Sequence, residues 1–197
     1  MSIKLKIASF WLPKFILKKE LDNIAIKTTE ALINVLKQYA PNKNYKKLFL
    51  KGDIEKRRII MTEAHNNLVQ ELIGILGYEK AIRVGRKTMF NVGYQLGRDA
   101  RRRLGVGNNF HDLETAAQIL YRVLGIDFKI DNKNGNIIMT VQKCALSKNY
   151  TPEACIVLSA ADEGVVCGLN ENINMQFKDR ITEGAPECIA CINEVKI

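Results

Sequence analysis

Apolar residues recur at intervals of three and four between residues 18 and 124, which is the spacing of one face of an α-helix. The pattern is interrupted at Pro41, Gly77 and Gly105, residues that commonly end helices. It predicts helices over residues 18–39, 53–76, 79–104 and 112–124. Asp53 and Asp112 are the expected N-caps of the second and fourth.

The last third of the chain alternates apolar with polar residues, the period of a half-buried strand. Asn134-Gly135 predicts the tight turn of a hairpin. Thr151-Pro152 is a helix-start signal, and Gly168 is the expected end of that helix. The predicted strands cover residues 126–130, 137–141, 173–178 and 188–195.

Two short segments near the N-terminus are also expected to be extended. Residues 2–8 alternate in the same way and predict a strand, and residues 45–51 are expected to form an edge strand. The fold class that follows is α+β: a helical N-terminal part packed on a four-stranded, mostly antiparallel sheet with one inserted helix. We divide the chain into an N-terminal extension, 1–52, and a ligand-binding α+β domain, 53–197.

Composition narrows the class of protein. The chain has 197 residues, 47% of them hydrophobic and 26% charged, as in ordinary soluble globular proteins. No apolar run approaches the roughly 20 residues that span a bilayer, so we expect no membrane partner and a cytoplasmic protein. Five cysteines, an odd number, indicate free thiols in a reducing compartment.

The net charge of +9 is uneven. Residues 1–104 hold 22 Lys and Arg against 9 Asp and Glu, which gives +13, and residues 105–197 hold 8 against 12, which gives −4. A basic half can bind nucleic acid. No aromatic residues are interleaved with the basic ones, so solvated helix faces are the better interpretation and a nucleic-acid partner is unlikely.

Small residues line one stripe of the helix predicted over residues 79–104. Ala81, Gly85, Met89, Gly93 and Gly97 share this face. Glycine inside a helix costs about 1 kcal/mol relative to alanine, so the stripe needs a reason. Close helix packing, in particular across a homodimer interface, is favoured over room for a ligand.

Three chemically active residues share one face of the helix that begins at Thr151. Cys155, Ser159 and Asp162 are spaced by four and three residues. A buried carboxylate can act as an acid or base, and a thiolate as a nucleophile. These three are the catalytic candidates, and the alternative is that Cys155 is a small core residue.

A metal site is a further possibility for the cysteines. Cys144, Cys155 and Cys188 mark neighbouring predicted elements, but zinc needs about four ligands and a fourth is not evident. Cys188 and Cys191 would point to opposite faces of a strand. His65 lies beside its helix's apolar stripe and is expected to be a core-edge histidine.

Several short motifs between residues 68 and 195 resemble the hydrocarbon-binding domain family named after the bacteriochlorophyll 4-vinyl reductase. They are 76–81 (LGYEKA), Gly93, Gly97, 124–126 (LGI), Cys155 and 184–188 (GAPEC). The resemblance implies a small-molecule binding or sensing protein, often a homodimer, that encloses a hydrophobic ligand. The residues we expect to contact this ligand are Met89, Gly93, Gly97, Cys155 and Phe177.

Phenol-sensing relatives in that family hold zinc through three cysteines and a glutamate. By position, Cys155 and Cys188 match two of these ligands. The other two fall near Phe177 and Arg180, so the chain departs from the zinc pattern.

Residues 140–191 also resemble the aminothiazoline-carboxylate hydrolase family, with a poorer likeness before them. The matching residues are Cys144, Cys155, Asp162, 168–170 (GLN), Arg180, Gly184-Ala185 and Cys188. This resemblance implies hydrolysis of a C–N or C–S bond in a small cyclic substrate, in which Cys155 or Asp162 would act. Whether the chain is an enzyme stays open at this point.

Overall fold

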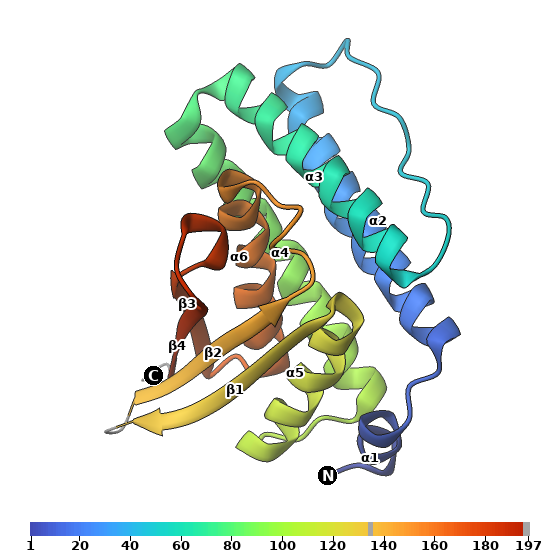
Figure 1. Ribbon diagram of the computed structural model, residues 1–197, viewed down its shortest axis with the longest axis vertical. Coiled ribbons are helices and arrows are strands. Elements are labelled where there is room, and N and C mark those ends of the chain that lie inside the picture. The colour runs from blue at the N-terminus through green and yellow to red at the C-terminus, as the bar shows by residue number, and fades with distance from the viewer. Residues whose placement is uncertain (134–135, 195–197) are drawn as a thin grey trace.

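The computed structural model describes residues 1–133 and 136–194 (Figure 1). Within them the chain forms six α-helices, four strands and one 3₁₀ helix, which confirms the α+β class. In chain order these are α1 Ile3–Phe10, α2 Lys14–Tyr39, α3 Ile54–Leu76, α4 Tyr78–Leu104, α5 Phe110–Leu124, β1 Ile126–Lys133, β2 Asn136–Cys144, α6 Pro152–Leu169, β3 Ile173–Asp179, η1 Ile181–Glu183 and β4 Cys188–Glu194.

The four strands form one sheet in the order β1-β2-β4-β3, and all three pairings are antiparallel. Helix α6 is inserted between β2 and β3, as expected. Met139, Met175, Ala190 and Ile192 are buried on the inner face, because residues two apart along a strand share a face. Helices α5 and α6 pack against the sheet, and α4 lies against α6 (Figure 1). The predicted turn at Asn134-Gly135 lies outside the described residues.

The strand predicted for residues 2–8 is wrong, because this segment is helix α1. Ser2 caps the helix: its hydroxyl accepts a hydrogen bond from Leu5 N and donates one to Leu104 O. Of the alternating apolar residues only Leu5 is buried, while Ile3 and Ile7 are exposed. The alternation therefore does not mark a strand with one buried face.

The edge strand predicted for residues 45–51 is also wrong, because the segment pairs with no strand. It crosses the surface as an irregular connection between α2 and α3. The Tyr45 hydroxyl donates a hydrogen bond to Glu71 Oε1 at 2.6 Å, and Leu48 and Leu50 pack on the core. Side-chain contacts, rather than a ladder, hold it in place.

Several helix ends differ from the predictions. Helix α2 begins at Lys14, directly after Pro13, rather than at residue 18. The N-cap of α5 is Asn109, whose side chain accepts from Asp112 N at 2.8 Å, so Asp112 lies in the first turn. Helix α6 ends one residue beyond Gly168.

The backbones of α4 and α6 meet at glycines contributed by both helices. A Cβ on Gly93 would lie 1.9 Å from Ala161 O, and one on Gly97 would lie 2.3 Å from Val165 O. In return, Gly164 faces the Phe90 carbonyl and Gly168 the Tyr94 carbonyl, at 2.1 and 2.2 Å from a built Cβ. The stripe therefore serves helix packing, as favoured, but within one chain. The homodimer stays a prediction.

The N-terminal helices share the core with the sheet. Leu21 and Ala25 of α2 and Met61 of α3 lie in the same buried cluster as Met139 and Met175. These core contacts join residues on both sides of residue 52. The division of the chain at that residue stays a prediction.

Adding a methyl group at this glycine contact should destabilise the fold. In a Gly93→Ala variant the new carbon would meet a backbone carbonyl that cannot rotate away, so the free energy of unfolding should fall by about 3 kcal/mol. Gly74→Ala is the matched control: Gly74 lies in helix α3, nothing lies within 4 Å of a built Cβ, and the change should stabilise by about 0.5–1 kcal/mol. Urea unfolding of both variants measures the difference. Equal stabilities would contradict this account of the contact.

Candidate functional site

The predicted catalytic face of α6 lines a cavity. Cys155, Ser159 and Asp162 all border this space, whose volume is about 120 Å³. The other walls come from α2, α3, α4, α5, the adjoining ends of β1 and β2, and the segment that links β2 to α6. They are predominantly apolar, with Leu120, Leu124, Leu146, Leu158 and Val165 among them. The three residues that helical spacing placed on one face of α6 therefore all face the same cavity.

Hydrogen bonds fix the start of α6 beside α3. Thr151 Oγ1 accepts from Ala154 N at 3.2 Å, and Pro152 follows in the first turn, as the sequence predicts. Asn66 of α3 accepts from Thr151 N at 3.1 Å and donates to Asn149 O at 2.7 Å. The cap of α6 is therefore held by a side chain of another helix.

Asp162 is the carboxyl that α6 contributes to the cavity wall. Burial raises its pKa to about 7; the Glu163 carboxylate adds to the rise, and Tyr121 and Arg180 oppose it. The side chain is half-buried and borders the cavity. The nearby Tyr121 hydroxyl is buried and makes no well-oriented hydrogen bond with any described residue. A carboxyl that loses its proton near neutral pH can serve as general acid or base.

Cys155 is a thiol, not a thiolate, at neutral pH. Burial raises its pKa to about 11, and the Cys188 and Cys144 sulfurs add to the rise. The nearby Thr182 hydroxyl and Arg180 oppose the rise but do not outweigh it. Burial raises the pKa of Cys144, which also lines the cavity, to about 11. Neither sulfur is activated as a nucleophile.

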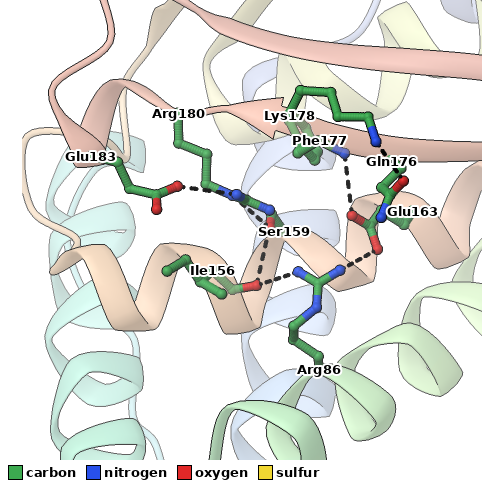
Figure 2. A network of polar contacts seen from close by, with 9 residues as sticks. All are labelled: Arg86, Ile156, Ser159, Glu163, Gln176, Phe177, Lys178, Arg180 and Glu183. Carbon is green, nitrogen blue, oxygen red and sulfur yellow. Dashed lines mark hydrogen bonds and ion pairs between the residues drawn. The ribbon is translucent and has the colours of Figure 1, made fainter. Parts of the chain in front are cut away.

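Ser159 is fully engaged with its neighbours. Its hydroxyl donates to Ile156 O at 3.1 Å and accepts from Arg180 Nε at 3.2 Å (Figure 2). Arg180 also donates to Glu183 Oε2 at 3.1 Å, and its guanidinium lies 5.5 Å from the Phe177 ring centre. Ser159 thus positions a buried arginine, and its proton is not available to a base.

A second ion pair joins α4, α6 and β3. Arg86 Nη2 donates to Glu163 Oε2 at 2.7 Å, and its Nη1 donates to Ile156 O at 2.8 Å (Figure 2). The other carboxylate oxygen of Glu163 accepts from Phe177 N at 3.4 Å. Both oxygens of the buried Glu163 carboxylate therefore have hydrogen-bond partners, one on α4 and one on β3.

His65 borders the cavity from α3 and is neutral. Burial lowers its pKa to about 3. The Thr28 hydroxyl lies 2.8 Å from Ile24 O and 2.9 Å from His65 Nε2. His65 Nδ1 lies 2.7 Å from the Tyr150 hydroxyl, so each ring nitrogen has a hydrogen-bond partner. The predicted core-edge histidine is therefore a buried one with both nitrogens bonded.

The cavity opens toward solvent between α2 and α4. Glu20 and Arg103 line it and also reach the surface, and they form a paired contact of 2.9 and 3.1 Å. Asn23 lies beside them on α2. This ion pair lies across the entrance, where a charged group on a ligand would meet it.

The sequence-predicted residues divide between the cavity and its supports. Cys144, Cys155, Ser159 and Asp162 line it. The other predicted residues lie outside the cavity lining. Of those expected at a ligand, Met89, Gly93 and Gly97 face α6 or the core, and Phe177 lies under Arg180. The metal candidate Cys188 accepts a hydrogen bond at Sγ from Ile181 N at 3.3 Å.

The predicted zinc ligands do not form a metal site. Across residues 1–133 and 136–194, no three His, Cys, Asp or Glu side chains converge well enough to hold a metal ion. Cys144 ends β2, Cys155 lies on α6 and Cys188 begins β4, and these three do not make up such a group.

Sequence reasoning missed the two tyrosines and the entrance pair. Tyr121 lies on α5 four residues after Ala117 and three before Leu124, so the helical spacing could have placed it on the inner face. Tyr150 directly precedes the α6 cap. No sequence signal joins Glu20 to Arg103, because they lie 83 residues apart.

A sequence profile of the L-2-amino-thiazoline-4-carboxylic acid hydrolase family matches residues 57–192. The chain belongs to this family. The likeness noted over residues 140–191 therefore extends back into α3, and the family segment includes α3 through β4 with most of the cavity wall. A search of curated protein sequences finds no match.

Two solved structures share the fold. One is trafficking protein particle complex subunit 3 from Naegleria fowleri, covalently bound to palmitic acid: TM-score 0.54 and 12% identity, covering 70% of this chain and 94% of that chain. The other is the phenol-responsive sensory domain of the transcription activator PoxR with phenol: TM-score 0.53 and 16% identity, covering 84% and 89%. At these identities the likeness concerns the fold.

The pH dependence of stability should expose His65. In the unfolded chain this histidine takes up a proton near pH 6.5, whereas in the folded chain it does so near pH 3. Between these values the unfolded state binds more protons, so His65 lowers the free energy of unfolding by about 1.4 kcal/mol for each unit that the pH falls. Urea unfolding at pH 4 to 7 should show a smaller loss toward low pH in His65→Gln.

Asp162 supplies the opposite slope and the control. Its folded pKa of about 7 lies above the unfolded value, so the folded state binds the extra proton and stability falls as the pH rises through this range. Asp162→Asn should remove that fall and leave the His65 slope steeper. Parallel pH profiles for the native chain and both variants would contradict the burial assigned to these groups.

Proposed function

We propose that the cavity binds a small, uncharged, ring-shaped molecule. The observation that carries this proposal is a space of about 120 Å³ with an apolar lining and a few polar groups at fixed positions. Small-molecule sites in proteins have this character. We also propose that the site closes around its ligand.

Volume limits the ligand. An apolar cavity of roughly 150 Å³ binds benzene in another protein, so a space of about 120 Å³ suits a single five- or six-membered ring. The PoxR sensory domain, which shares the fold, is described with phenol, a ligand of this size. A long acyl chain such as palmitate would need a larger space.

The polar groups in the wall would orient the ring. Asp162, protonated or ionised near neutral pH, can donate or accept one hydrogen bond. The Tyr121 hydroxyl is buried without a well-oriented partner in the described chain and can bond a ligand oxygen or nitrogen. Tyr150 is already committed to His65. Together, these two neighbouring groups favour a ring that carries one hydroxyl or amino group.

Changing the volume at one position should separate binding from folding. Cys155→Met places a longer, flexible side chain in the cavity and should lower the affinity for phenol by about tenfold or more. Cys155→Ala enlarges the space and should retain binding. Isothermal titration calorimetry with phenol measures both.

Cys167→Met, on the same helix but outside the cavity lining, is the control and should bind phenol like the native chain. If Cys155→Met has the melting temperature of the native chain and binds phenol with unchanged affinity, phenol binds elsewhere. If the native chain does not bind phenol, the proposal that the cavity binds such a ring is wrong for phenol.

Hydrolysis of a small ring is the second candidate function. Membership of the hydrolase family favours it, and so does the pKa of about 7 that burial gives Asp162. Because Cys155 stays protonated, we infer that water, rather than the thiol, attacks the ring carbon, and that Asp162 takes a proton from this water as the C–O bond forms. The ring C–N or C–S bond then breaks, and the protonated Asp162 returns the proton to the leaving nitrogen or sulfur. A carboxylate on the substrate would lie toward Arg103 at the entrance.

Turnover of 2-aminothiazoline-4-carboxylic acid, followed by chromatography, tests this candidate. Asp162→Asn should lower the rate by about a hundredfold or more, because general bases contribute on this scale. The rate with the native chain should rise with pH through a midpoint near 7, since the ionised carboxylate is the active form. Cys155→Ala and Cys167→Ala should both remain active. Full activity in Asp162→Asn would exclude this mechanism.

A further inference from the structure

Large apolar side chains are exposed on the outer face of α1 and at the turn into α2. Ile3, Ile7, Phe10, Trp11 and Phe15 are 79%, 58%, 81%, 68% and 70% exposed. We call these five residues the N-terminal apolar surface. Scattered exposed apolar residues are common, but five within 13 consecutive positions form a patch of the kind that marks an interaction site.

Helix geometry separates this surface from the core contact of α1. At about 100° per residue, Ile3, Ile7 and Phe10 fall within one narrow sector, and Leu5 points to the opposite side. Leu5 is fully buried, in a cluster that includes Ala100 of α4. The inner face thus attaches α1 to the protein and leaves the outer face free. Figure 1 shows α1 at one end of the molecule's long axis.

Positive charge surrounds the surface. Lys4 and Lys6 flank the apolar sector of α1 on either side, and Lys14 and Lys19 are exposed near Trp11 and Phe15. Residues 1–19 contain five lysines and no aspartate or glutamate. Within the described part of the chain, none of these lysines forms an ion pair.

We propose that the N-terminal apolar surface docks on the face of an anionic lipid bilayer. Aromatic and aliphatic side chains would enter the headgroup boundary while the lysines stay at the level of the lipid phosphates, the arrangement of interfacial helices. A second copy of the chain is a poorer occupant, because it would bring five lysines against five. No helix in the described chain is apolar and long enough to cross a membrane, and the proposal needs none.

This inference departs from the sequence-based expectation of no membrane partner. The alternation of residues 2–8 had predicted a strand, in which Leu5 would share its face with Ile3 and Ile7. In the helix, Leu5 is buried and the other two are exposed. The proposal is independent of the ligand in the cavity.

Trp11 reports on docking directly, because it is the chain's one tryptophan. Vesicles of phosphatidylcholine with about one third phosphatidylserine should shift its emission to shorter wavelength and protect it from iodide quenching. The protein should bind vesicles of phosphatidylcholine alone at least about tenfold more weakly, because each lysine near an anionic surface adds to the affinity. High salt should weaken the binding for the same reason.

Two variant pairs locate the surface. Ile7→Ser with Phe10→Ser should lower vesicle co-sedimentation by about tenfold or more, whereas Phe49→Ser, at a residue 78% exposed in the α2–α3 connection, should leave it unchanged. Lys4→Glu with Lys6→Glu should lower vesicle co-sedimentation to a similar extent. Lys46→Glu with Lys47→Glu, in the α2–α3 connection, is the matched control and should leave it unchanged. Leu5 is kept throughout, and an unchanged melting temperature confirms that the chain is folded.

Two outcomes would overturn the proposal. In one, Trp11 is shielded without vesicles, the protein sediments as a dimer, and Ile7→Ser with Phe10→Ser makes it a monomer; the surface would then be covered by a second copy. In the other, vesicles leave the emission of Trp11 unchanged at low salt, and the surface does not bind lipid at all.

Discussion

The close contact between the backbones of α4 and α6 determines where the rest of the structure can lie. Four glycines remove the side chains that would otherwise hold the two helices apart. With one face of α6 against α4, its other faces must meet the sheet and the helical hairpin of α2 and α3. The face that carries Cys155 and Asp162 is directed at the junction of these elements, and the cavity lies there. The glycines thus support the site without lining it.

Burial sets the chemistry of this cavity. Glu163 and Arg180, both buried, are paired with groups of opposite charge, Arg86 and Glu183. Groups without a partner of opposite charge respond by shifting their pKa toward the neutral form, downward for His65 and upward for Asp162. Near pH 7 His65 is therefore neutral and Asp162 is partly protonated. An uncharged ring fits such a space better than an ion does.

Sequence periodicity predicted most of the fold, because helices and strands that bury one face leave a regular pattern. The four long helices, the sheet and the inserted helix all follow from it. It failed at residues 2–8, where alternation gave a strand, since a short helix with a single buried residue, Leu5, has no detectable stripe. Residues 45–51 are held by contacts such as Tyr45 to Glu71, which no local pattern encodes.

The site was only partly predictable. The spacing of Cys155, Ser159 and Asp162 placed them on one helix face, but it could not say that Ser159 is committed to Arg180. Gly93 and Gly97 were correctly judged to favour packing, yet the sequence could not reveal that the partner is α6 of the same chain. Tyr121, Tyr150 and the Glu20–Arg103 pair come together only through tertiary packing.

A crystal structure of the chain soaked with 4-bromophenol would test the central claim most directly, because the anomalous signal of bromine locates the ring without further assumptions. The account predicts one strong peak inside the cavity, in contact with Leu158 and beside Asp162. A peak only at the surface, or side chains that fill the space between α6 and α5, would contradict it.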